Sequence, residues 1–281
     1  MKVLLTGANG QLGRCFQDRL PTDWQIRATD STKLDITDLE QVNSAVLAFK
    51  PDAIVNAAAH TAADKAESEA DLAERINAAG PANLASVAAQ HGIRLVHVST
   101  DYVFDGNAST PYTEESPTNP LSVYGKTKLA GEVAVSSAAP DAIVVRTAWV
   151  FSEYGNNFVK TMLRLGKERD ALSIVDDQRG CPTYAGDLAQ AIIALLQQNA
   201  AGGIYHYAGD KEVSWFEFAQ AIFSVAVQKS VLSKAPALTP ITTAQYPTPA
   251  HRPAYSTLAG GKIQGLGIAL SDWQSALNKT I

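Results

Sequence analysis

Short apolar segments alternate with amphipathic segments along the first half of the chain. The apolar segments have the length of buried strands, and they cover residues 3–6, 24–29, 53–56, 95–99 and 142–147. The amphipathic segments have the apolar spacing of helices, and they cover residues 10–20, 38–50, 71–91 and 122–132. Asp38 stands where the side-chain cap of the second helix is expected.

This alternation of strands and helices predicts an α/β fold, a Rossmann-type, doubly wound parallel sheet. We expect residues 1–150 to form a dinucleotide-binding domain, which part of the segment 183–210 rejoins. After Trp149 the pattern loosens into short helices, isolated strands and turns, and five prolines fall between positions 236 and 253. Residues 151–281 are therefore expected to form mainly a substrate-binding lobe.

The overall composition narrows the class of protein. With 281 residues, 46% hydrophobic and 18% charged, the chain is long enough for a full core and has the composition of a globular enzyme. A net charge of −5 and the lack of any Lys/Arg-rich block argue against a nucleic-acid partner. No apolar run is long enough for a bilayer, and the start does not resemble a signal peptide, so we expect no membrane partner and a cytoplasmic location.

The two cysteines, Cys15 and Cys181, are far apart in the sequence. Two cysteines do not make a disulfide framework in a chain of this size. No Cys/His pair has the spacing of a metal site, so the sequence predicts no metal.

A glycine loop, Gly7-x-x-Gly10-x-x-Gly13, follows the first strand and opens the first helix. Glycines here allow a tight turn and a close approach of the backbone to a pyrophosphate, whose charge lies at the helix N-terminus. The alternative is a plain strand–helix turn, but the position in the first βαβ unit favours a dinucleotide site. The predicted cofactor-binding residues of this loop are Gly7, Asn9, Gly10, Gln11 and Leu12.

Asp30 follows the second strand, where an acid meets the adenosine ribose in dinucleotide-binding folds. A carboxylate there favours NADH, because it repels a 2′-phosphate. Arg14 and Arg27 are near in sequence and could reverse that preference, so the predicted cofactor is NADPH or NADH. The alternative for Asp30 is a surface turn residue.

Tyr124 and Lys128 form a Y-x-x-x-K pair at the start of a predicted helix. Residues four apart share a helix face, so both can point into one cleft. A free phenol has a pKa near ~10, and a nearby ammonium favours the phenolate, which lowers that pKa. The pair therefore suits proton transfer in a carbonyl–alcohol interconversion. The alternative is an exposed Tyr–Lys face.

Thr100 follows the fourth strand, and the carboxyl ends of parallel strands are where such sheets bind ligands. A hydroxyl there can hydrogen-bond a substrate carbonyl and share its developing negative charge. Taken together, the glycine loop, this hydroxyl and the Tyr124/Lys128 pair resemble the short-chain dehydrogenase/reductase family.

Further segments resemble the dTDP-4-dehydrorhamnose reductase branch of that family, in its extended form. The resemblance spans nearly the whole chain, through residues 55–61, 64–67, 99–104, 124–132, 146–150, 155–158, 177–183, 246–249 and 252–253. It implies reduction of the C4 ketone of dTDP-4-dehydro-6-deoxy-L-mannose to dTDP-L-rhamnose. It implies that Tyr124 supplies the proton, that Lys128 holds the cofactor ribose and tunes Tyr124, and that Thr100 polarises the carbonyl.

The same resemblance implies more binding residues. For the cofactor these are Asp35, Ile36, Ala57, Ala58 and Ala59, the three alanines being equally compatible with plain strand–helix packing. For the substrate they are Thr100, Asp101, Tyr124, Trp149, Asn157 and Arg252. Trp149 could instead be a core aromatic, and Arg252, a bidentate match for a diphosphate, could instead form a surface ion pair.

One departure concerns Cys15. Some relatives carry an acid at this position that helps to bind a metal at a dimer interface, and a further metal-site acid is not evident after Thr183. We therefore expect a monomer or a weak homodimer, with Cys15 as a buried apolar residue.

Two other functions remain open at this stage. A reductase or epimerase of another nucleotide sugar shares the same fold and the same three catalytic residues. A non-catalytic regulatory subunit of methionine adenosyltransferase also belongs to this family, although an intact Tyr124/Lys128 pair argues against that function.

Overall fold

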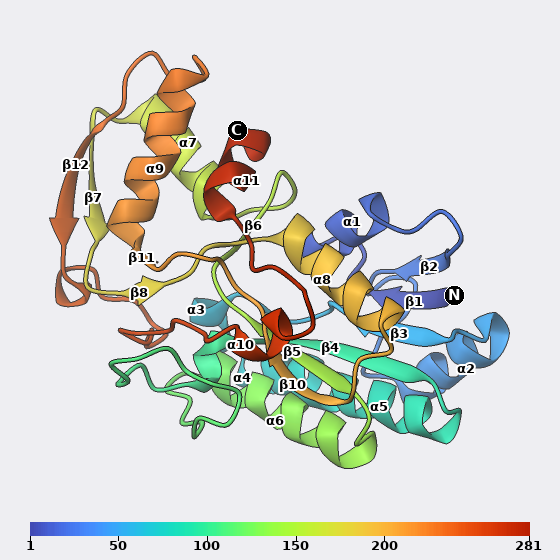
Figure 1. Cartoon of the computed structure of the whole chain (residues 1–281). Coiled ribbons are helices and arrows are strands. Elements are labelled where there is room, and N and C mark those ends of the chain that lie inside the picture. Colours follow the sequence, from blue (N-terminus) through green and yellow to red (C-terminus); the bar gives the residue numbers. More distant parts are fainter.

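The computed structural model describes residues 1–281 and is built around one parallel sheet of six strands (Figure 1). The spatial order is β10-β5-β4-β3-β1-β2, and all five pairings are parallel. The strands are β1 (Lys2–Thr6), β2 (Gln25–Thr29), β3 (Ala53–Asn56), β4 (Arg94–Thr100), β5 (Ile143–Thr147) and β10 (Gly203–His206). The α/β, doubly wound fold predicted from the sequence is confirmed.

Helices cover both faces of this sheet, which is why its strands β1, β3 and β5 are buried almost throughout. Alternate residues of β1 point to opposite faces: Val3 and Leu5 pack with α1 (Gln11–Asp18) and α8 (Ala185–Gln197). Leu4 packs on the other face with α2 (Leu39–Phe49), α5 (Gly80–Gln90) and α6 (Val123–Ala138). Asp38 caps α2 as predicted, since its carboxylate accepts hydrogen bonds from the N–H groups of Glu40 and Gln41.

The predicted helix over 71–91 is present in three pieces. They are α4 (Ala70–Glu74), a π-helical turn (Arg75–Ala79) and α5. The wider turn contains Asn77, whose side chain bonds both backbone groups of His60 and the hydroxyl of Thr127. These contacts between distant segments explain a change of helix type that the helical spacing does not reveal.

A smaller group of elements lies beside the carboxyl ends of the strands (Figure 1). It contains α7 (Phe158–Glu168), α9 (Trp215–Gln228) and α11 (Trp273–Thr280), with the paired strands β7 (Ala171–Val175) and β12 (Ala237–Ile241). Its separate apolar core includes Phe151, Phe218 and Trp273. We call this group the small lobe; its expected role in substrate binding stays a prediction.

The remaining helices and strands are short. They are α3 (Ala63–Ala66), α10 (Gly261–Gln264), β6 (Val150–Phe151), β8 (Arg179–Gly180), β9 (Thr183–Tyr184) and β11 (Val213–Ser214). β6 pairs with β9, and β8 pairs antiparallel with β11. None of the helices combines the length and the apolar character that crossing a membrane requires.

The chain reverses direction across the sheet at β1. It runs from β1 to β2 on one side and then continues with β3 on the other side of β1. In open α/β sheets this reversal leaves a crevice at the carboxyl ends of the strands, where ligands bind. The glycine loop after β1 and the alanines after β3 lie at this point.

Candidate active site

A cleft of about 1050 Å³ opens at the carboxyl ends of the strands. Sixteen of the eighteen site residues predicted from the sequence line it. Those sixteen are Gly7, Asn9, Gly10, Gln11, Leu12, Asp30, Asp35, Ile36, Ala57, Ala58, Ala59, Thr100, Asp101, Tyr124, Lys128 and Trp149. Asn157 and Arg252 do not line it. The fold therefore gathers segments from the whole N-terminal half of the chain into one site.

The glycine loop lies closely against the end of β3. Gly7 has φ of 69°, and a Cβ added there would lie 2.5 Å from the carbonyl carbon of Ala57. A Cβ at Gly13 would lie 2.2 Å from the carbonyl oxygen of Gly7. No side chain caps α1, whose N-cap is Gly10, so the N–H groups of its first turn are free to meet an anion. The glycine loop and the N-terminus of α1, together called the glycine cradle below, fit a pyrophosphate.

Asp30 lies at the rim of the cleft, beside the loop. Its carboxylate accepts hydrogen bonds from Asn9, at 2.6 Å, and from the hydroxyl of Thr32, at 2.6 Å. The bond from the Thr32 hydroxyl is the main reason that the pKa of Asp30 lies below its ordinary value. Neither neighbouring arginine reaches the cleft: Arg14 lies over the ring of Tyr154, and Arg27 donates to the carbonyl of Ala45. The cation that acts on the carboxylate is Lys33, whose charge also lowers the pKa of Asp30.

The residues expected at the adenine end are held by local contacts. Asp35 accepts from the N–H and the hydroxyl of Thr37. Ile36 is 5% exposed, and the Asn83 amide donates to its carbonyl oxygen. Their position in the cleft fits an adenine contact, which stays a prediction.

The predicted acid–base pair projects from the start of α6. Ser122 caps this helix by accepting from the N–H of Gly125, at 3.1 Å, so Tyr124 falls in the first turn. Lys128 follows one turn later, and its buried ammonium donates to the carbonyl of Val98 on β4, at 2.6 Å. Thr100, at the end of β4, donates to the Asp101 carboxylate, at 3.0 Å.

Burial governs the electrostatics of Tyr124. Burial raises its pKa to about 12, and the nearby Thr100 hydroxyl opposes this only in part. Burial also lowers the pKa of the Lys128 ammonium to about 8. In the structure the Lys128 ammonium donates to the carbonyl of Val98, and burial decides the direction of the Tyr124 pKa; the expected tuning of the phenol by Lys128 stays a prediction. Tyr124 is a protonated phenol at neutral pH, which is the form that can donate a proton.

Three buried polar atoms at the ends of β4 and β5 lack hydrogen-bond partners. They are Ser99 Oγ, Asp101 Oδ2 and Thr147 Oγ1, and all three residues line the cleft. Buried polar groups are normally paired, so an unpaired cluster at one place indicates a site for a polar ligand. The set fits the hydroxyl groups of a ribose or a hexose. Sequence reasoning missed Ser99 and Thr147, although polar residues that end apolar strands are a usable signal.

The stability of the protein at different pH values tests whether the Asp101 carboxyl is buried. Burial raises the pKa of its carboxyl from 3.8 to about 6, a shift that corresponds to roughly 3 kcal/mol. A raised pKa in the fold means that stability is lost as the pH rises from about 4 through about 6. We therefore expect Asp101→Asn to stabilise the protein at pH 7.5 by up to that amount, and by little at pH 4. Urea unfolding at both pH values measures this.

Asp30→Asn is the matched control for Asp101→Asn. Because the pKa of Asp30 lies below its ordinary value, its replacement is expected to show the opposite pH trend. If the effect of Asp101→Asn were the same at both pH values, the carboxyl would titrate normally and the buried environment assigned to it would be wrong.

Trp149 lies in the cleft wall with an unusual backbone conformation. Its φ is 48°, in the left-handed region. Its ring stacks on Trp215, the first residue of α9, with centroids 3.5 Å apart. Trp215 also lines the cleft. Trp215 has no local sequence signal, since a tryptophan at the start of a helix is as compatible with a core.

The two remaining predicted residues are held elsewhere. Asn157 caps α7 and donates to Gln11 and to the carbonyls of Ser152 and Tyr154, so its side chain is fully engaged. Arg252 forms an ion pair with Asp64, at 2.8 Å. The structure thus places neither of them in the cleft wall, and their predicted contacts with a diphosphate stay predictions.

Metal ligands do not gather in this structure. No group of three or more His, Cys, Asp or Glu side chains has an arrangement that could hold a metal ion. Cys15 and Cys181 are both free and buried, and burial raises the pKa of each thiol.

The fold and this cleft define a dinucleotide-dependent oxidoreductase of the extended short-chain dehydrogenase/reductase class. The glycine cradle, the Tyr124/Lys128 pair and the Thr100 hydroxyl all open into the same space.

Comparison with known proteins identifies the family. A family model described as the RmlD substrate binding domain matches residues 1–281. The dTDP-4-dehydrorhamnose reductase of Aggregatibacter actinomycetemcomitans is 48% identical, over 98% of this chain and 97% of its own length. The chain belongs to the dTDP-4-dehydrorhamnose reductase family.

Two further relatives bear on the cofactor and the substrate. The crystal structure of dTDP-4-dehydrorhamnose reductase from Bacillus anthracis in complex with NADP has a TM-score of 0.94 and 40% identity, covering 99% of this chain and 98% of that one. A probable dTDP-4,6-dihydroxy-2-methyloxan-3-one 4-ketoreductase of Streptomyces antibioticus is 42% identical, over 99% of this chain and 94% of its own length.

Proposed function

We propose that this protein reduces the C4 ketone of dTDP-4-dehydro-6-deoxy-L-mannose to dTDP-L-rhamnose, with NADPH or NADH as the reductant. The relatives named as dTDP-4-dehydrorhamnose reductases support the substrate, and the relative with bound NADP supports the cofactor. The observation that carries the proposal is the convergence of Tyr124, Lys128 and Thr100 with the glycine cradle in one cleft.

A nicotinamide cofactor supplies a hydride when it is bound. The Tyr124 phenol, which is protonated at neutral pH and whose pKa burial raises to about 12, donates a proton to the ketone oxygen. The Thr100 hydroxyl, which donates to Asp101 in the structure, turns to the same oxygen and stabilises its developing charge.

Lys128 acts as a fixed donor in this scheme. One of its three N–H groups binds the carbonyl of Val98. The other two are available to ribose hydroxyls and to the Tyr124 oxygen, which would stabilise the phenolate left after proton transfer. The unpaired oxygens of Asp101 and Thr147 are placed to receive or donate hydrogen bonds with sugar hydroxyls.

A turnover assay with the purified protein tests the proposal, because oxidation of the reduced cofactor is followed as a loss of its absorbance. We expect turnover with dTDP-4-dehydro-6-deoxy-L-mannose, generated in place by a dehydratase and an epimerase, and both NADPH and NADH should be assayed. A faster reaction with another dTDP-4-keto sugar would favour the second candidate, the 4-ketoreductase activity named for the Streptomyces antibioticus relative. If none of a panel of such sugars were reduced, the result would contradict the proposal and favour a regulatory subunit.

Other expectations stay predictions. These are the use of Arg252 for the diphosphate, the contact of Asp30 with the cofactor, the monomeric or weakly dimeric state and the cytoplasmic location.

A further inference from the structure

Two tryptophans from different parts of the chain form one continuous surface in the cleft. Trp149 follows β5 of the large sheet, and Trp215 begins α9 of the small lobe. Their rings are 7° from parallel at a centroid distance of 3.5 Å, and both line the cleft. The stacked pair thus joins the two lobes in the wall of the cleft.

Trp149 is held in a conformation that bulky residues rarely adopt. A φ of 48° is strained for any residue with a large side chain, and such strain persists only where the surroundings enforce it. Gly180 provides the space for its ring, because a Cβ there would lie 2.7 Å from the indole carbon Cε2. Strained residues of this kind cluster at ligand sites.

Trp215 is held by the neighbouring segment 176–180. Its indole N–H donates to the side-chain oxygen of Gln178, at 3.1 Å. Gln178 is itself buried, at 5% exposure, and donates to Thr243. The strand pairing of β8 with β11 places Gly180 opposite Val213, two residues before Trp215.

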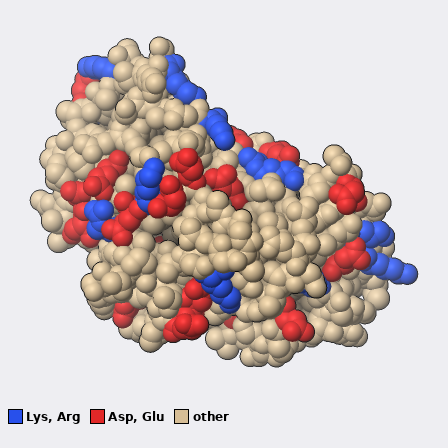
Figure 2. Space-filling model, viewed as in Figure 1, with Lys and Arg blue, Asp and Glu red and all other residues tan.

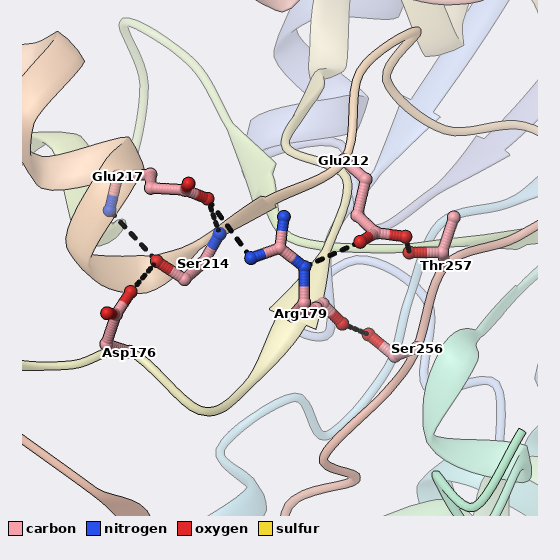
Figure 3. A network of polar contacts seen from close by, with 7 residues as sticks. All are labelled: Asp176, Arg179, Glu212, Ser214, Glu217, Ser256 and Thr257. Atoms are coloured by element: carbon pink, nitrogen blue, oxygen red, sulfur yellow. Dashed lines mark hydrogen bonds and ion pairs between the residues drawn. The ribbon is translucent and has the colours of Figure 1, made fainter. Parts of the chain in front are cut away.

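A polar network fixes the helix turn that carries Trp215. Figure 3 shows the Arg179 guanidinium between Glu212, at 2.6 Å, and Glu217, at 3.3 Å. Ser214, the N-cap of α9, exchanges hydrogen bonds with Glu217 and donates to Asp176. On the surface drawn in Figure 2, acidic and basic side chains are mixed over β8 and β11. The segment 176–180 therefore fixes both indoles, a role that the proposed chemistry does not explain.

The position of the pair relates it to the reacting group. Thr147 of β5 is the register partner of Thr100 on β4, and Trp149 is the second residue after Thr147. Given ~4.8 Å between strands and ~3.5 Å per residue, the Trp149 backbone lies within roughly 10 Å of Thr100. A hexose whose ketone meets Thr100 would therefore lie near Trp149, on which Trp215 stacks.

We propose that Trp215 is a hexose-binding residue. With Trp149 it forms a double-indole wall that contacts the apolar face and the C6 methyl group of a 6-deoxy sugar, and Gln178 and Gly180 are its positioning residues. An apolar wall accepts a methyl group, whereas a hydroxyl at C6 would lose its hydration without gaining a partner. This inference rests on the proposed function.

Kinetics of Trp215→Leu and Trp215→Phe test the proposal. We expect Trp215→Leu to raise KM for the keto sugar about tenfold or more, with a much smaller change in kcat. Trp215→Phe, which retains a stacking ring, should recover most of the loss. The Kd for NADPH and the inhibition constant of dTDP should not change, since neither ligand contains the hexose. Trp273→Phe, which alters a buried indole of the small lobe core, is the control and should leave KM unchanged.

Gln178→Leu tests the positioning role. It removes the acceptor for the Trp215 N–H and should raise KM with little effect on kcat. A loss of thermal stability with an unchanged KM would show that Gln178 has only a structural role and would overturn that assignment. For Trp215 itself, an unchanged KM in Trp215→Leu, or an equal loss of affinity for dTDP, would overturn the proposal.

Binding measurements separate this inference from the proposed reaction. Quenching of tryptophan fluorescence by dTDP-L-rhamnose reports hexose binding without turnover. If the parent protein bound dTDP-L-rhamnose but reduced no keto sugar, the proposed function would fail, while weaker binding by Trp215→Leu would still support the wall. Equal binding by parent and variant, or no binding by either, would overturn the inference.

Discussion

Tyr124→Phe is expected to lower kcat for keto-sugar reduction by about 10²- to 10⁴-fold, the usual contribution of a positioned general acid. The substitution removes only the hydroxyl that would donate the proton. Because burial raises the pKa of Tyr124 to about 12, the parent phenol is protonated across the neutral range, so the loss should be nearly independent of pH between 6 and 8.

Cofactor binding should be retained by this variant. The glycine cradle is formed by a separate segment, so the Kd for NADPH is expected to match that of the parent. Tyr205→Phe is the matched control, because it removes a phenol whose hydroxyl donates to the carbonyl of Ala201, outside the cleft. Turnover of Tyr124→Phe at the parent rate would remove Tyr124 from the role of acid.

Glu132→Leu is expected to lower the free energy of unfolding by about 3–5 kcal/mol, the usual cost of leaving one partner of a buried ion pair alone. Glu132 on α6 binds Arg146 on β5 through both carboxylate oxygens, at 2.7 to 3.2 Å, and both side chains are 3% exposed. Arg146 also lies over the ring of Phe104. Without Glu132, a guanidinium would remain in the core with no opposite charge.

The free energies of unfolding of two further variants, measured with urea, are compared with that of Glu132→Leu. Glu168→Ala breaks the exposed pair with Arg164 and should cost no more than about 1 kcal/mol. The double variant Glu132→Leu with Arg146→Met should recover most of the stability, because it replaces both charges with apolar groups. A Glu132→Leu variant as stable as the parent would show that the pair is not buried in solution.

The elements that the sequence predicted best are those whose cause is local. The strand at 53–56 coincides with β3, and the Asp38 cap and the start of α6 lie where the pattern places them. The glycine loop was also identified locally, since its spacing and its place after a strand define its geometry. Each of these depends on residues within a few positions of one another.

The omissions in the site concern contacts between distant segments. The helix spacing does not reveal that the Lys128 ammonium donates to the carbonyl of Val98, 30 positions away. The indole of Trp215 lies against Trp149, 66 positions earlier in the chain, only in the folded protein. Neither contact has a local sequence signal.

The amino-acid sequence alone determined the parallel α/β sheet, the dinucleotide loop and the pairing of Tyr124 with Lys128 on one helix face, because hydrophobic period and helix geometry act over a few residues. Only the tertiary structure decided the raised pKa of Tyr124, the unpaired oxygens beside Thr100 and the stack of two indoles. Burial and long-range contact set these properties, and they exist only once the strands and lobes have come together.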